Sequence, residues 1–243
     1  MIIEQVKWDS DFFGIKIGKI TVYDEADFDP NLFKQEAIDN NFNLIYIFKF
    51  QTLLSVKSVL NADLELMDIQ LTMSKIFNSH EFLNKPFNFR TELSNNELKE
   101  CYLISENTSS ASRFYSEKLI GPNKTKELYR KWIDNAINKQ YVDGILLFKN
   151  CNEIAGIHLI KTDEKSQTGF CSLIGVSPNS KGTGIGRNLW EQAFSYWAQK
   201  KSIEICKVPF SLQNAESFNF HLKMGFNKIE EIKYIYHYRN KIK

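Results

Sequence analysis

The stretch CSLIGVSPNSKGTGIGR, residues 171–187, joins an apolar, strand-like run to a glycine-rich turn that opens a helix near Arg187. Gly182, Gly184 and Gly186 let the backbone turn tightly and aim consecutive N–H groups at one point. The first turn of the helix adds unpaired amides and the positive end of its dipole. The stretch therefore predicts a binding site for a phosphate or pyrophosphate.

The spacing within this turn excludes two other phosphate-binding motifs. Arg187 stands where a dinucleotide-binding fingerprint needs its third glycine, and the Lys-Ser/Thr pair of a nucleoside-triphosphate loop is missing. A simpler interpretation is that the glycines only connect a strand to a helix. Three glycines within five residues, flanked by Lys181 and Arg187, favour the anion site.

The charges of the chain nearly balance, with 31 Lys and Arg against 29 Asp and Glu in 243 residues. We therefore expect neither a nucleic-acid partner nor a membrane partner. The four cysteines contain no C-x-x-C pair, which predicts reduced thiols in a cytoplasmic protein. We expect a soluble, unprocessed chain, because the amino terminus lacks a signal pattern and no apolar run could span a bilayer. We also expect no resident metal.

The first part of the chain has its own α/β pattern. Alternating apolar residues and turn signals predict strands and helices in succession, with Asp29 and Pro30 as the N-cap and first residue of a helix. The pattern breaks near Pro86. We therefore predict a smaller N-terminal α/β domain over 1–92 and a second domain over 93–243. The expected strands cover 15–22, 44–50 and 64–77, and the expected helices cover 30–39 and 53–60.

The second part predicts a sheet around the glycine turn. Helices are expected from residue 97 and over 124–138, and three antiparallel strands over 144–149, 153–160 and 169–176. A helix and a strand over 203–210 follow, which places the strands on either side of the helix parallel to one another. Pro209 cannot donate to a neighbouring strand, so the parallel pair should splay apart near it. An extended ligand with amides and a pyrophosphate, such as coenzyme A, fits such a gap.

Two motifs in this part resemble the GNAT acetyltransferase superfamily: KGTGIG at 181–186 and NAESFNFHLKMGF at 214–226. The resemblance covers about 96–243 and implies the GNAT fold, a mixed, mostly antiparallel sheet with splayed central parallel strands flanked by helices. It implies acetyl-CoA as co-substrate and a strand N–H that meets the thioester carbonyl. Lys181 departs from the usual Gln or Arg. The implied coenzyme-binding residues are Leu173, Ile174, Val176, Lys181, Gly182, Thr183, Gly184, Ile185, Gly186, Arg187 and Asn214.

Other segments resemble acyltransferases related to dTDP-fucosamine (dTDP-4-amino-4,6-dideoxygalactose) acetyltransferase: WDSDFFG at 8–14, SRFYSE at 112–117 and LYRKWIDNAI at 128–137. This resemblance implies a nucleotide-linked amino-deoxy sugar as acceptor, a role in polysaccharide biosynthesis, and an acceptor site to which the N-terminal domain contributes. It implies acceptor contacts from Arg113 and Tyr115, although Arg113 also fits an ordinary surface arginine. The large apolar residues of WDSDFFG are expected in the core.

The proton donor to the leaving thiolate is assigned to His221. The GNAT family usually has a tyrosine at this position, four residues before the glycine of the Gly-Phe pair, and a histidine can also donate. The other interpretation is a helix histidine without a role. No general base is assigned; His158 and Glu153 lie on a candidate strand. Cys171 is expected to pack in the core and not to form an acyl-enzyme.

Two competing functions remain open. One is a GNAT acetyltransferase for another amine, such as a peptide, a polyamine or an aminoglycoside, which an acidic acceptor cleft would favour. The other is a non-catalytic coenzyme-binding module, which the missing tyrosine suggests. The sequence is also compatible with a homodimer.

Overall fold

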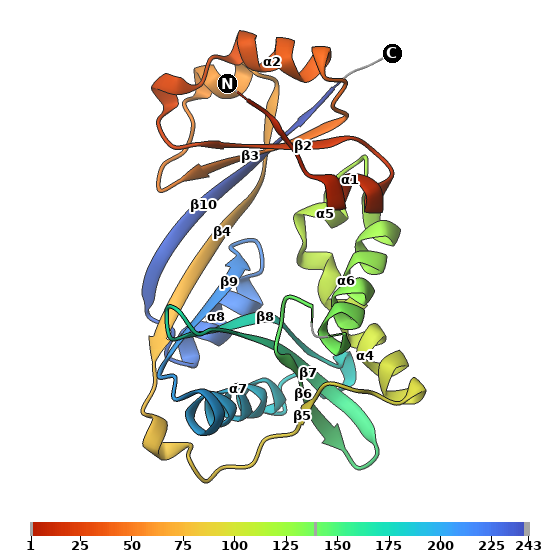
Figure 1. Cartoon of the computed structure of the whole chain (residues 1–243), viewed down its shortest axis with the longest axis vertical. Helices are drawn as coiled ribbons and strands as arrows, with labels where there is room; N and C mark the ends of the chain where they lie inside the picture. The colour runs from red at the N-terminus through yellow and green to blue at the C-terminus, as the bar shows by residue number, and fades with distance from the viewer. Residues whose placement is uncertain (1, 139, 241–243) are drawn as a thin grey trace.

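One mixed sheet runs through the computed structural model, which describes residues 2–138 and 140–240. Within those residues ten strands pair in the order β1-β2-β3-β10-β4-β9-β8-β7-β6-β5 (Figure 1). Most neighbours are antiparallel; β2 with β3 and β8 with β9 are parallel. The strands are β1 (Glu4–Gln5), β2 (Ile17–Val22), β3 (Leu44–Phe50), β4 (Leu64–Ile76), β5 (Phe89–Arg90), β6 (Gly144–Asn150), β7 (Glu153–Asp163), β8 (Thr168–Val176), β9 (Ile205–Ser211) and β10 (Lys228–Arg239).

Helices flank this sheet, and several of them begin at a residue whose side chain caps the helix. The Asp29 carboxylate accepts hydrogen bonds from the N–H groups of Asn31 at 2.8 Å and Leu32 at 3.1 Å, which fixes the start of α2. Ser94 and Glu97 form a capping box at the start of α4. The helices are α1 (Lys7–Phe13), α2 (Pro30–Asp39), α3 (Val56–Asn61), α4 (Asn95–Thr108), α5 (Arg113–Ser116), α6 (Gly121–Ile137), α7 (Ile185–Tyr196) and α8 (Ala215–Lys223).

The predicted splay of the central parallel strands is confirmed. β8 pairs with β9 only from Thr168 opposite Ile205 to Phe170 opposite Lys207, and Pro209 lies beyond the last pair. The other edge of β9 stays paired with β4 along its whole length, up to Gln70 opposite Ser211. The gap therefore opens because the edge of β8 loses its partner, while β9 is held by β4.

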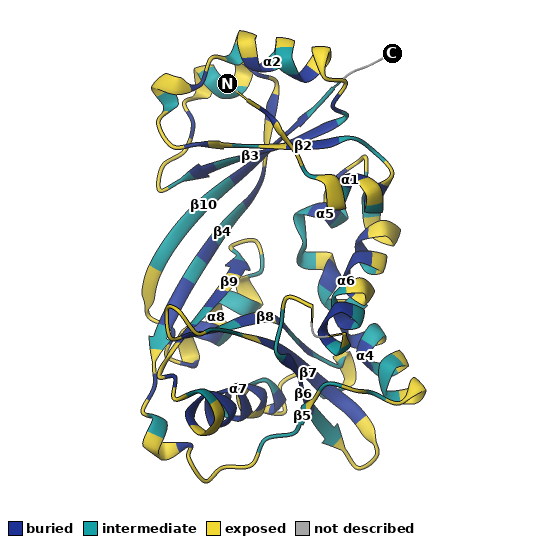
Figure 2. Ribbon diagram, in the orientation of Figure 1, coloured by how far each residue is buried: buried dark blue, intermediate teal, exposed yellow. Residues whose placement is uncertain are grey.

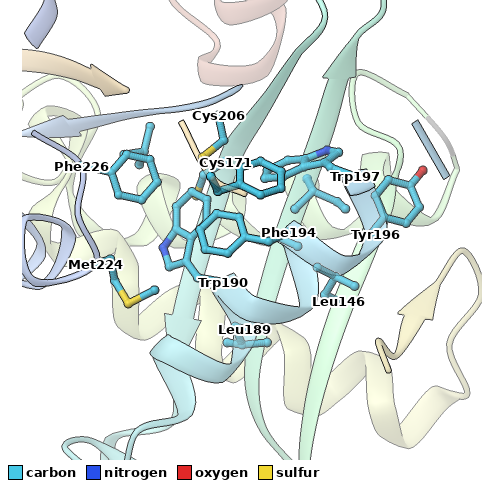
Figure 3. Close-up of a cluster of buried hydrophobic side chains, with 14 of the residues drawn as sticks. Leu146, Cys171, Leu189, Trp190, Phe194, Tyr196, Trp197, Cys206, Met224 and Phe226 are labelled. Carbon is cyan, nitrogen blue, oxygen red and sulfur yellow. The ribbon is translucent and has the colours of Figure 1, made fainter. Parts of the chain in front are cut away.

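The core on one side of the sheet is built around α7. Figure 3 shows Trp190, Phe194 and Trp197 packed against Cys171 and Cys206 of the two parallel strands. Trp190 and Trp197 are fully buried, and Figure 2 shows much of α7 in the colour of buried residues. At about 25 cal/mol per Å2 of apolar surface, burial of such large rings dominates the packing energy of this layer. A second cluster, on α4 and α6, packs against β6, β7 and β8.

The strands of the first 92 residues join the same sheet as the rest of the chain. β10, the last strand, lies between β3 and β4 and pairs with both of them. The domain boundary between residues 92 and 93 stays a prediction. Four short elements escaped the sequence patterns: β1, α1, α5 and β5. α1 ends at Gly14, at φ +72°, and β2 begins at Ile17, two residues after the expected start of that strand.

Gly169 sits where the parallel pair is closed, and it has no room for a side chain. A Cβ atom there would lie 2.3 Å from the Trp197 ring. We expect Gly169→Ala to lower the free energy of unfolding by about 1–3 kcal/mol through overpacking, with a fall in Tm of roughly 2–4 °C per kcal/mol. Urea and thermal unfolding measure the effect. Ser172→Ala, at an exposed position of the same strand, is the control, and equal stability of the two variants would contradict this account.

Candidate active site

The predicted anion site is a loop of freely exposed amides at the start of α7. Gly182 has φ +78° and Gly184, the N-cap of α7, has φ +86°. A Cβ atom on either would meet nothing within 4 Å, so the backbone angle, not crowding, favours glycine here. No side chain of the described residues caps α7. Its first-turn N–H groups therefore remain available to a phosphate.

The flanking residues tie this loop to α8. Lys181 forms an exposed ion pair with Glu216 of α8 at 2.9 Å, and a Cβ on Gly186 would lie 3.1 Å from the Phe220 ring. Asn214 caps α8 by accepting a hydrogen bond from the Ser217 N–H at 3.0 Å. The structure therefore brings the two predicted coenzyme-binding segments, 181–187 and the start of α8, side by side.

The unpaired edge of β8 supplies the other predicted contacts. Leu173 is buried against the α4 and α6 side, and Ile174 and Val176 pack toward α7. Beyond Phe170 the backbone groups of β8 that face β9 have no partner on that strand. Such N–H and C=O groups can pair with the amides of an extended ligand and stabilise an oxyanion.

A cleft of about 890 Å3 lies where the two strands part. Cys171, Ser172 and Pro209 form its floor, at the end of the β8–β9 pairing. Trp8 and Asp9 of α1 line it as well. In Figure 1, α1 and α6 form a column that faces β4 and β10 across this part of the molecule. The cleft is large enough for a small-molecule ligand.

Residues 99–226 match the sequence model of the acetyltransferase (GNAT) family. The chain belongs to the GNAT acetyltransferase family. The GNAT fold, acetyl-CoA as co-substrate and an acyltransferase activity follow from this membership. The loop at 181–187 and the unpaired edge of β8 are the parts of this chain that fit the coenzyme's pyrophosphate and its amide-bearing arm.

Solved structures share the fold at low sequence identity. A conserved protein of unknown function from Staphylococcus epidermidis superposes with a TM-score of 0.63 at 12% identity, over 93% of this chain and 84% of that one. A GCN5-related N-acetyltransferase from Kribbella flavida gives a TM-score of 0.54 at 9% identity, over 91% and 80%. Another from Sphaerobacter thermophilus gives 0.51 at 12%, over 87% and 67%. No protein with a curated description matches the chain significantly.

The described residues contain neither a metal-binding cluster nor a membrane-spanning helix. In the ranges 2–138 and 140–240, no group of His, Cys, Asp and Glu side chains is arranged to hold a metal ion. Within the same ranges, no helix is long and apolar enough to cross a membrane.

His221 lies inside the core and not on the cleft. It is 1% exposed, and its Nδ1 donates to the Ser217 carbonyl at 2.8 Å. Burial lowers the pKa of His221 to about 4, so the ring is neutral at pH 7. With the proton on Nδ1, the buried Nε2 carries none. This geometry favours a packing role, and the assignment of His221 as proton donor stays a prediction.

Of the other catalytic candidates named from the sequence, His158 and Cys171 are buried and Glu153 is not among the residues that line the cleft. His158 is fully buried, its Nδ1 faces the Leu189 carbonyl at 3.3 Å, and burial lowers its pKa to about 3. Burial raises the pKa of the Cys171 thiol, which makes its thiolate scarce. Both observations agree with core packing. Glu153 is exposed at the β6–β7 turn.

Arg113 and Tyr115 lie on the short helix α5, behind the cleft wall. The Arg113 guanidinium stacks over the rings of Phe114 and Tyr46, and its Nε is buried. Tyr115 is half-buried, and neither residue is among those that line the cleft. Their contact with the acceptor stays a prediction.

Trp8 and Asp9 line the cleft but were not expected there, because the sequence pattern did not predict α1 and placed Trp8 in the core. Trp8 is 41% exposed.

The positive φ of Gly184 should be needed for coenzyme affinity. Gly184→Ala strains the turn by about 1–2 kcal/mol, so we expect the Kd of acetyl-CoA to rise roughly 5- to 30-fold, as measured by calorimetry. Gly121→Ala is the matched control: its φ is +76° and a Cβ there also meets nothing within 4 Å, but it lies at the start of α6. If both variants bind acetyl-CoA equally well, the loop does not hold the pyrophosphate.

The role of His221 is tested by replacement with a ring of similar size. If the neutral, inward-facing histidine only packs, His221→Phe should change kcat by far less than the roughly 100- to 10,000-fold loss expected when a general acid is removed. The pH profile should also keep its shape, because the pKa of about 4 leaves the ring uncharged throughout pH 6–9. A large fall in kcat with loss of the basic limb would restore His221 as the donor.

Proposed function

We propose that this GNAT enzyme transfers the acetyl group of acetyl-CoA to the amine of a nucleotide-linked amino-deoxy sugar, with a dTDP-linked sugar as the first candidate. The observation that supports this most is the position of the cleft. It opens where the β8–β9 pairing ends, so an amine bound in it would face the end of the coenzyme arm.

Two features of the cleft favour a bulky acceptor with rings and a phosphate. Trp8 and Trp132 expose indole rings to it, and flat rings stack well on bases and sugars. Lys161 on β7 adds a cation for a diphosphate. The carboxylate of Asp163 also lines the cleft but accepts hydrogen bonds from the Lys165 N–H and the Ser166 hydroxyl in its own turn. These bonds occupy two acceptor positions of this carboxylate and leave fewer for a polyamine, and Asp9 is the other carboxylate in the lining.

The reaction requires direct attack by the neutral amine. Its nitrogen bonds to the thioester carbon, the carbonyl oxygen becomes an oxyanion, and backbone N–H groups of β8 past Phe170 stabilise that charge. The C–S bond then breaks, the amine gives up a proton, and the coenzyme thiolate takes one. An acyl-cysteine step at Cys171 is disfavoured by its buried thiol. A cytoplasmic location and a homodimer stay predictions.

The acceptor class is tested by thiol release from acetyl-CoA. The panel contains dTDP- and UDP-linked 3-amino and 4-amino deoxysugars, polyamines, aminoglycosides and peptides, and calorimetry first checks coenzyme binding. We expect turnover with a nucleotide sugar, and Trp8→Ala should raise the KM for that sugar while leaving the Kd of acetyl-CoA unchanged. Turnover with polyamines or aminoglycosides alone would replace the proposed acceptor class.

A further inference from the structure

A polar cluster is buried in the N-terminal wall of the cleft. It consists of Asp9 on α1, Tyr46 on β3, Arg113 on α5 and His237 on β10, four residues far apart in the sequence. Tyr46 and His237 are register partners in the β3–β10 pair, with ring centroids 5.0 Å apart. The Arg113 guanidinium carbon lies 5.4 Å from the centroid of the Tyr46 ring. Figure 1 shows α1 and α5 together beside these strands.

Two buried polar atoms of this cluster, Arg113 Nε and His237 Nε2, have no hydrogen-bond partner among the described residues, while the Tyr46 hydroxyl interacts with the Asp9 carboxylate. Tyr46 is 2% exposed and His237 is fully buried. Each buried unsatisfied polar group costs about 1–3 kcal/mol of stability. Two such groups lie in this cluster together with a carboxylate that lines the cleft, and functional sites are one place where such groups are retained.

The back of the cluster is fixed by Glu117, which is fully buried. It accepts hydrogen bonds from His237 Nδ1 at 2.5 Å and from Arg239 Nε at 2.7 Å. Burial alone would raise the pKa of Glu117, but these hydrogen bonds bring it down to about 2. His237 therefore holds its proton on Nδ1, toward Glu117, and turns the lone pair of Nε2 into the cluster.

Asp9 is the member of the four that lines the cleft. Burial raises the pKa of its carboxyl, while the Tyr46 hydroxyl and the Arg113 charge beside it act in the opposite direction. Arg113 is balanced further by Asp68 of β4, which accepts a hydrogen bond from the Ser211 hydroxyl at 2.5 Å. The cleft floor carries Ser172 and Pro209. A carboxylate on the wall of the same cleft can reach an amine bound above that floor.

We propose that Asp9 binds the acceptor's amino group and takes its proton, and that Tyr46 and Arg113 are positioning residues that hold the Asp9 carboxylate toward the cleft. This inference rests on the proposed function only in requiring an amine acceptor. The ammonium group of the acceptor gives one proton to Asp9, and its freed lone pair forms the N–C bond. The nitrogen of the tetrahedral intermediate releases its second proton to solvent, the C–S bond breaks as the oxyanion collapses to the amide carbonyl, and the protonated Asp9 returns its proton to the coenzyme thiolate.

Asp9→Asn tests the carboxylate, and Asp11→Asn is the matched control on the same helix, because Asp11 is exposed and outside the cleft. We expect Asp9→Asn to lower kcat roughly 100- to 10,000-fold and to leave the Kd of acetyl-CoA unchanged. Asp11→Asn should match the wild type. The measurements use the full chain and the amine that gives the fastest turnover. An unchanged kcat in a folded Asp9→Asn variant would overturn the proposal.

Tyr46→Phe tests positioning with a readout that a merely structural role would not move. Loss of the hydroxyl raises the pKa of Asp9 further, so the acid limb of kcat/KM should move to higher pH while the plateau is kept. The titration of the amine itself is common to all variants and cancels in the comparison. An unmoved limb would overturn the positioning role of Tyr46. Turnover with a polyamine that is lost in Asp9→Asn would refute the nucleotide-sugar acceptor and still support Asp9.

Discussion

The site depends on the incomplete pairing of the two parallel strands at the centre of the sheet. β8 and β9 are joined over only three residue pairs, from Thr168–Ile205 to Phe170–Lys207. Complete pairing would satisfy the backbone groups of β8 and leave no polar edge for an extended ligand. Partial pairing leaves that edge free directly beside the amide loop at the start of α7, so one defect in the sheet aligns two binding surfaces.

Packing keeps the gap from closing or spreading. Trp197 lies so close to Gly169 that only glycine fits at the closed end of the pair, while β4 holds β9 along its full length. The buried aromatic layer around Trp190 fixes α7, and with it the loop that carries Gly182 and Gly184. The anion site is therefore rigid on its core side and open on its solvent side.

The first 92 residues add Trp8 and Asp9 of α1 to the lining of the cleft. β3 and β4 enclose β10, and α1 contributes to the wall of the cleft whereas α5 does not. Polar groups are buried beside it, and the Glu117 carboxylate accepts hydrogen bonds from His237 Nδ1 and Arg239 Nε. Arg113 Nε and His237 Nε2 are buried there without a hydrogen-bond partner among the described residues, and Asp9 is the member of this cluster that lines the cleft.

Local patterns in the sequence determined the coenzyme half of the protein. Glycine spacing at 182–186, apolar alternation over β6 to β8 and Pro209 predicted the loop, the strands and the splay, because each follows from backbone geometry within a short segment. The burial of His221, the exposure of Trp8 and the meeting of Asp9 with Tyr46, Arg113 and His237 were decided only by the tertiary structure. These depend on which strands lie side by side and which helix face is covered, and such contacts join residues up to two hundred positions apart that no local pattern connects.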